Sequence, residues 1–126
     1  MFFEIDYDNY YLSKSLRFVM FHIEKDQNDQ FVFYLKSDKK HTIATSKTFA
    51  KIEEVKNTIK YIAENTNLDR IYERKTNKQG QFYFNILNVR LQTTAQSQYY
   101  NSKAGLENGI KAAKEFAKLH KIKSKF

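Results

Sequence analysis

Cysteine, proline and tryptophan are absent from this 126-residue chain, and it holds only three glycines. Without cysteine it cannot form a disulfide, a thiolate metal site or a catalytic thiol, and without proline it has no rigid spacer between domains. No apolar run approaches the roughly 20 residues that cross a bilayer. The opening residues, MFFEIDYD, carry acids where a secretion signal is basic. We therefore expect one cytoplasmic domain with no membrane association.

The patterns that support catalysis or metal binding are also missing. His22, His41 and His120 are scattered, whereas zinc requires three or four closely spaced ligands. The stretch DYDN at 6–9 begins like a calcium loop but lacks the later glycine and glutamate, and no glycine-rich phosphate loop occurs. Ser46 and Ser97 are flanked by Thr, Gln, Lys and Ala rather than by a histidine base. These absences predict a protein that is not an enzyme and binds no cofactor or metal.

Aromatic residues and lysines are plentiful. Eleven Phe and nine Tyr supply a core, and the formal net charge is +8. Most of the excess charge lies in the final stretch, KAAKEFAKLHKIKSKF. We favour a solvated helix face followed by an edge strand protected by lysines. The alternative is a surface that follows a phosphate backbone or meets an acidic partner.

Two halves of the chain match without a gap when one is shifted by 51 residues. The phrase DQFVFYL at 29–35 aligns with GQFYFNI at 80–86, and Asn57 aligns with Asn108. Such a period indicates a repeated supersecondary unit. In each copy, segments that resemble three strands (18–25, 30–35 and 41–46; 70–76, 81–86 and 91–97) precede an apolar stripe of helical period. Ser102 is placed to cap the second helix, and Thr48 is the candidate for the first.

The segment around Ile71 aligns both with the end of the second unit, at Ile122, and with the start of the first, at Met20. It therefore ends one unit and begins the next. The closing strand at 120–126 has no following unit, so we expect it to lie beside the first strand, near Phe21. Its alternation places Ile122 on a buried side and lysines outside.

These residues resemble the YegP-like family of small bacterial proteins of unknown function. The second copy carries GQFYF, then Ser97 and Tyr100, then SKA at 102–104 and NGI at 108–110. The first copy is degenerate, with Asp29 and Thr58 in place of two glycines. The resemblance covers about residues 18–126 and implies an α+β fold, in which two tandem β(3)-α-β repeats form a single antiparallel sheet with exchanged C-terminal strands. It implies no activity, substrate or cofactor.

The repeat divides the chain into an extension at 1–17, a first repeat at 18–69 and a second at 70–126. Both helices are expected on one face of the sheet, because each has an apolar stripe to bury. The acidic, aromatic extension is expected either to cover an edge strand or to dock a partner. With both copies in one chain, we expect a monomer or a weak homodimer.

Residues on the other face of the sheet are candidates for recognition. Phe82 and Phe84 belong to the core, which leaves Tyr34, Tyr83 and Asn85 on the open side. Asn57 and Asn108 occupy equivalent helical positions, where each bonds backbone or a neighbouring strand, or both form a paired ligand site. The sequence thus predicts a non-catalytic binding or accessory module with a protein partner.

The alternative is weak binding of RNA or single-stranded DNA. It would use the open sheet face and Lys121, Lys123 and Lys125, and it would be sensitive to salt.

Overall fold

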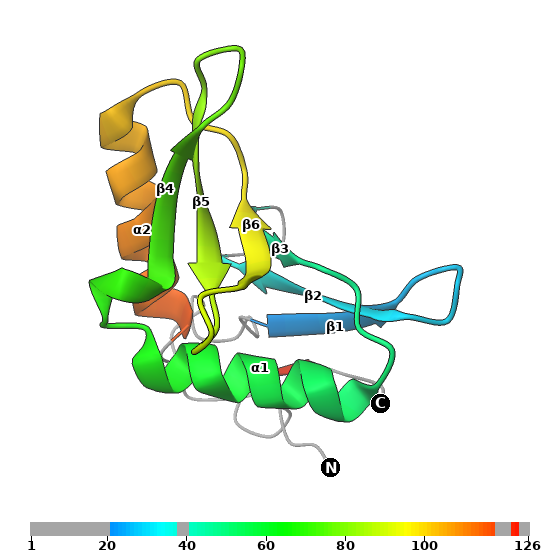
Figure 1. Cartoon of the computed structure of the whole chain (residues 1–126). Helices are drawn as coiled ribbons and strands as arrows, with labels where there is room; N and C mark the ends of the chain where they lie inside the picture. Colours follow the sequence, from blue (N-terminus) through cyan, green and yellow to red (C-terminus); the bar gives the residue numbers. More distant parts are fainter. Residues whose placement is uncertain (1–20, 38–40, 118–121, 124–126) are drawn as a thin grey trace, which may run out of the picture.

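A computed structural model describes residues 21–37, 41–117 and 122–123 of the chain. The elements follow the order expected for two repeated units (Figure 1). The strands are β1 (Phe21–Lys25), β2 (Phe31–Lys36), β3 (Thr42–Ser46), β4 (Tyr72–Thr76), β5 (Phe82–Leu87), β6 (Thr93–Ser97) and β7 (Ile122–Lys123). The helices are α1 (Ile52–Asn65), the short 3-10 helix η3 (Asp69–Ile71) and α2 (Lys103–Ala117).

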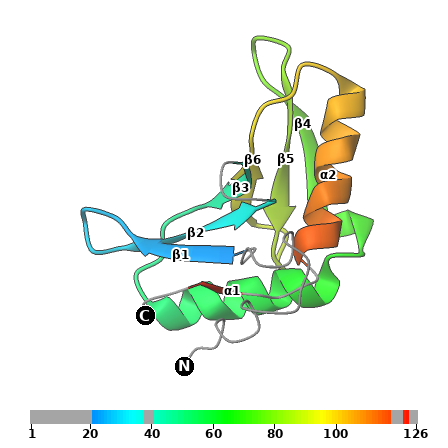
Figure 2. The ribbon, with the colours of Figure 1, turned by 180° about the vertical axis from the view of Figure 1, so that it is seen from behind.

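The strands form one sheet in the order β4-β5-β6-β3-β2-β1-β7. Within each unit the strands are antiparallel neighbours, and β3 and β6 join the units at the centre of the sheet. The strands of the first unit cross the direction of those of the second, so the sheet is strongly twisted (Figures 1 and 2). The predicted fold class, two β(3)-α-β units sharing a sheet, is confirmed.

The closing strand lies where the repeat predicts it. Ile122 pairs with Phe21 and Lys123 pairs with His22, so the end of the second unit is added to the first. The pairing is parallel, however, whereas the prediction was a wholly antiparallel sheet. Of the predicted strand at 120–126, residues 120–121 and 124–126 lie outside the described residues, as does the extension at 1–17.

Both helices cover one face of the sheet. α1 contacts β2, and α2 contacts β5, β2 and β3. Their apolar stripes share a core with Phe21, Phe33, Phe84 and their neighbours on the same face. Equivalent edge-to-face ring pairs occur in the two units, Phe21–Phe33 at 5.7 Å and Tyr72–Phe84 at 5.8 Å between centroids.

Backbone details also recur at the same offset. Asp29 and Gly80, 51 positions apart, both have positive φ, at 61° and 81°. The turn therefore demands a left-handed residue, which Gly supplies easily and Asp tolerates. In each unit one side chain organises the turn: Asp26 Oδ1 accepts the Asn28 and Gln30 N–H groups, and the Asn77 side chain does the same in the second unit.

Three predictions about where helices and strands begin can be compared with the structure. Ser102 Oγ accepts the Gly105 N–H at 3.0 Å, so it caps α2 as expected. Thr48 does not cap α1; instead the Glu54 carboxylate reaches back to the Lys51 N–H at 3.1 Å. The strand predicted from residue 70 begins at Tyr72, because η3 occupies the turn before it.

Candidate binding surface on the open face of the sheet

The two faces of the sheet differ sharply in what covers them. Phe33, Leu35, Phe84 and Ile86 are fully buried beneath the helices. The residues that alternate with them point to the opposite face, which we call the outer face. No described element packs over that face, and its exposed or half-buried positions include Tyr34 and Tyr83.

A row of polar side chains crosses the outer face from strand to strand. The paired positions run, in order, through Glu73, Asn85, Gln96, Thr45, Tyr34 and His22. We call this set the polar row. Under the 51-residue shift the last three positions correspond to the first three, so the row is built twice from one pattern with different side chains.

A pair of tyrosines lies beside the polar row. Tyr83 stands two residues before Asn85 on β5, and its ring meets the ring of Tyr99 edge to face, with centroids 5.5 Å apart and planes at 90°. Tyr99 is 51% exposed. The pair offers an apolar surface with hydroxyl groups, although a perpendicular pair does not present one flat stacking platform.

Asn85 is the unusual member of the polar row. It is only 8% exposed, and its Nδ2 donates to Glu73 Oε1 at 3.1 Å. Its Oδ1 is buried and accepts no hydrogen bond from the described residues. A buried polar atom left without a partner destabilises the fold by about 1–3 kcal/mol. Asn85 is therefore a stability defect in the middle of an otherwise well-bonded strand.

The other predicted site residues do not converge on this surface. Asn57 and Asn108 are exposed on α1 and α2, and neither side chain makes a hydrogen bond within the described part of the chain. The expected bond to backbone or a neighbouring strand is thus wrong for both. Lys121 and Lys125 lie outside the described residues, and Lys123 is placed only through its backbone in β7.

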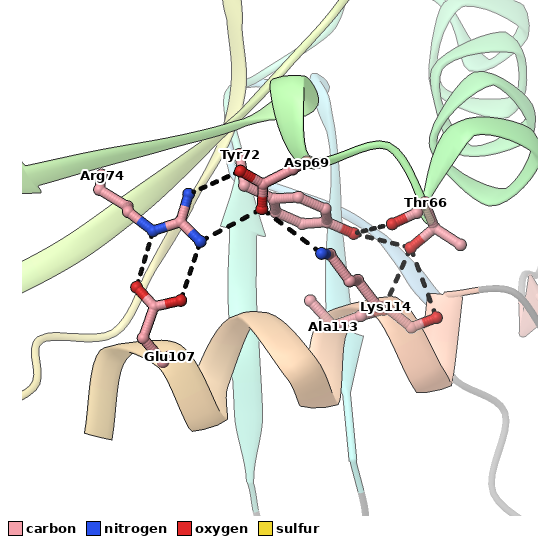
Figure 3. Close-up of polar contacts among 7 residues, drawn as sticks. All are labelled: Thr66, Asp69, Tyr72, Arg74, Glu107, Ala113 and Lys114. Carbon is pink, nitrogen blue, oxygen red and sulfur yellow. Dashed lines mark hydrogen bonds and ion pairs between the residues drawn. The ribbon is translucent and has the colours of Figure 1, made fainter. Parts of the chain in front are cut away.

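A charged cluster at the far edge of the sheet joins β4 to α2 (Figure 3). The Arg74 guanidinium donates to both carboxylate oxygens of Glu107, at 2.7 and 2.8 Å, and to Asp69 at 3.2 Å. Lys114 Nζ lies 3.4 Å from the same Asp69. Hydrogen bonds from Arg74 hold the pKa of Asp69 and of Glu107 below their ordinary values and raise the pKa of Arg74.

A buried hydroxyl pair lies next to the charged cluster. Thr66, at the end of α1, and the Tyr72 hydroxyl are 2.7 Å apart, and Tyr72 also donates to the Thr66 carbonyl at 3.1 Å. Burial raises the pKa of Tyr72 to about 12. Figure 3 shows both groups where α1, β4 and α2 meet, so we interpret them as a structural junction. Sequence reasoning missed the charged cluster of this junction because the repeat gives no sign of it. The equivalents of Arg74 and Glu107 in the first unit are Ile23 and Lys56, which cannot form the same ion pair.

Neither a cluster of metal-ligating side chains nor a membrane-spanning helix occurs in the described ranges. Within residues 21–37, 41–117 and 122–123, no three His, Asp or Glu side chains gather as a metal site would require. In the same ranges no helix is both long and apolar enough to cross a membrane.

Comparisons with known proteins agree on one group of relatives. Residues 77–123 match the family described as a domain of unknown function, DUF1508. The chain is 32% identical to a UPF0339 protein of Shewanella oneidensis over 82% of its own length and 94% of that protein. It is also 32% identical to the UPF0339 protein YegP of Escherichia coli, over 75% and 86%.

Two solution NMR structures share the fold. The UPF0339 protein of Shewanella oneidensis superposes with a TM-score of 0.78 at 32% identity, over 82% of this chain and 88% of that one. The YegP protein of Escherichia coli gives a TM-score of 0.79 at 29% identity, over 85% and 92%. That relative is described as a protein of unknown function.

Proposed function

The chain belongs to the UPF0339 (YegP) family, and on that premise we propose that it is a non-catalytic binding module that docks another protein on its outer face. The family gives no reaction to transfer, since the matching domain is described as one of unknown function. The proposal therefore depends on the chemistry of the surface itself.

The unpartnered Asn85 Oδ1 carries the proposal. Leucine is similar to asparagine in size and would remove the unpaired acceptor, so the asparagine lowers stability without serving the core. Because this atom is buried, a hydrogen-bond donor from a partner would satisfy it only if binding displaces the side chains that cover it. Glu73, which accepts from the same amide, would bring a second acceptor to the contact.

The neighbouring side chains fit a protein partner better than a nucleic acid. Amide and hydroxyl groups in the polar row can both donate and accept, as protein backbones and side chains require. Tyr83 and Tyr99 supply the aromatic area that is enriched at protein interfaces. Among the exposed charges of the outer face, Glu24 and Glu73 would repel phosphates and Lys75 would attract them, so charge does not favour a nucleic acid there.

Site-specific photo-cross-linking in the native cell tests the proposal. A photoreactive amino acid replaces Tyr83 or Thr45 on the outer face, and the matched controls replace the exposed Lys60 on α1 or Lys111 on α2. We expect discrete protein adducts from the two outer-face positions, and none of the same mass from the helix positions.

Three outcomes would contradict the proposal. Adducts that appear equally from both faces would indicate nonspecific contact. Adducts that nuclease removes would replace the protein partner with RNA or single-stranded DNA. Absence of any adduct from the outer-face positions would remove that face as the docking surface.

A further inference from the structure

The two units present equivalent sheet edges, and the described residues fill only one of them. β7 pairs with β1 at Phe21 and His22. The equivalent residues of the second unit, Tyr72 and Glu73, begin β4, which is the last strand at the other end of the sheet (Figure 1). No strand of the described residues pairs with the outer edge of β4. We propose that this edge pairs with β4 of a second copy of the chain, which extends the sheet across a two-fold axis.

The pairing of β4 with β5 determines which backbone groups face the free edge. Phe82 exchanges backbone hydrogen bonds with Tyr100, at 2.8 and 2.7 Å, and the Phe84 N–H donates to Ser97 Oγ. Phe82 and Phe84 therefore direct their backbone groups away from β4. Their partners Thr76 and Arg74 are non-hydrogen-bonded pairs, whose N–H and C=O groups point outward.

The backbone groups of Tyr72 also point outward from β4, as those of Arg74 and Thr76 do. Its N–H already donates to the Asp69 carbonyl, so its C=O is the group left for a partner. The outward groups are therefore those of Tyr72, Arg74 and Thr76. An antiparallel copy centred on Arg74 would exchange N–H···O=C bonds between the two Arg74 residues, and each Thr76 N–H would donate to Tyr72 of the other copy.

The outward backbone groups of Tyr72, Arg74 and Thr76 allow more than one antiparallel register between two copies. Side-chain charge favours the register that is centred on Arg74. Centred on Arg74, Glu73 of each copy lies opposite Lys75 of the other on the outer face, at the closely spaced type of pair. Centring on Glu73 or on Lys75 instead would oppose like charges. Charged edge strands ordinarily discourage pairing, but the order Glu73, Arg74, Lys75 makes this strand self-complementary.

The charged cluster removes the main objection to this register. The two Arg74 side chains would be neighbours on the helix-covered face, where two cations would repel each other. Each guanidinium is already held by the Glu107 carboxylate of its own chain at 2.7 and 2.8 Å and by Asp69. Its charge is thus balanced locally before any second copy arrives.

Sedimentation equilibrium of the full chain over a range of concentrations tests the proposal. We expect a reversible dimer. Glu73→Lys and Lys75→Glu should each weaken dimerisation by about tenfold, because each replaces two attractive cross-strand pairs with two repulsive ones. The double variant E73K/K75E should restore the wild-type dissociation constant, since the opposite charges meet again.

A proline variant provides an independent check on the backbone contacts. Thr76→Pro removes an outward N–H that bonds nothing among the described residues, so it should abolish the dimer while circular dichroism shows an unchanged fold. A wild-type chain that stays monomeric up to about 1 mM, the concentration of a weak complex, would overturn the proposal. So would a double variant that fails to restore dimerisation. Neither readout depends on the protein partner proposed above.

Discussion

Two equivalent serines allow the repeated architecture to be tested by measurement of stability. Ser46 Oγ accepts the Phe33 N–H at 2.8 Å, and Ser97 Oγ accepts the Phe84 N–H at 2.9 Å. Each hydroxyl also donates to the carbonyl of the next residue, at 2.6 and 2.7 Å. The serines are 8% and 6% exposed, so water does not readily replace them.

Replacement of either serine with alanine strands a buried backbone N–H between two strands. Such a loss lowers the free energy of unfolding by about 1–3 kcal/mol. For a domain of this size, each kcal/mol corresponds to a fall in Tm of about 2–8 °C. Because the contacts are the same in both units, we expect Ser46→Ala and Ser97→Ala to have similar effects.

Urea unfolding followed by circular dichroism measures both variants. The matched control is Thr48→Ala, which removes an exposed hydroxyl that does not cap α1 and should change stability by less than about 0.5 kcal/mol. If Ser46→Ala or Ser97→Ala behaved like the control, the buried cross-strand role would be refuted. A clear loss from one serine and none from its equivalent would refute the equivalence of the units.

Three further variants test other contacts. Gly109→Ala should destabilise the fold by about 1 kcal/mol or more, measured by thermal unfolding, because its Cβ would overlap the Tyr100 phenol; Tyr100→Ala in the same chain should recover part of the loss. Arg74→Gln should flatten the fall in stability below about pH 4, because Arg74 keeps the pKa of Glu107 low and that stabilisation disappears as acid protonates the carboxylate. Since burial raises the pKa of Tyr72 from 10.0 to about 12, wild-type stability should fall as pH rises between those values, and Tyr72→Phe should remove that slope in alkaline unfolding curves.

Most of the fold could be predicted from the sequence because it follows from local hydrophobic patterns, and the same patterns occur in both repeats. Alternation in 31–35 and 82–86 indicates which side chains are buried, and the helical stripes require a common sheet face. The repeat also predicts that Ile122 lies near Phe21. A glycine inside a helix indicates close packing, and Gly109 does lie against Tyr100; in the first unit the same positions hold Thr58 and Phe49.

Features that depend on long-range geometry could not be predicted. No residue pattern in the sequence indicates that β7 pairs with β1 in the parallel direction. Arg74, Asp69 and Glu107 look like ordinary surface charges until the fold brings them within hydrogen-bond distance. Asn85 was predicted to face outward, which is correct, but its burial depends on the twist and neighbours of the sheet.

The central claim is that Asn85 lowers the stability of the fold and is present on the outer face because it serves partner binding. The unfolding free energy of Asn85→Leu tests this claim most directly. We predict that the variant is more stable than wild type by about 1 kcal/mol, because leucine removes an unpaired buried acceptor. A variant less stable than wild type would show that the asparagine supports the fold, and it would contradict the claim.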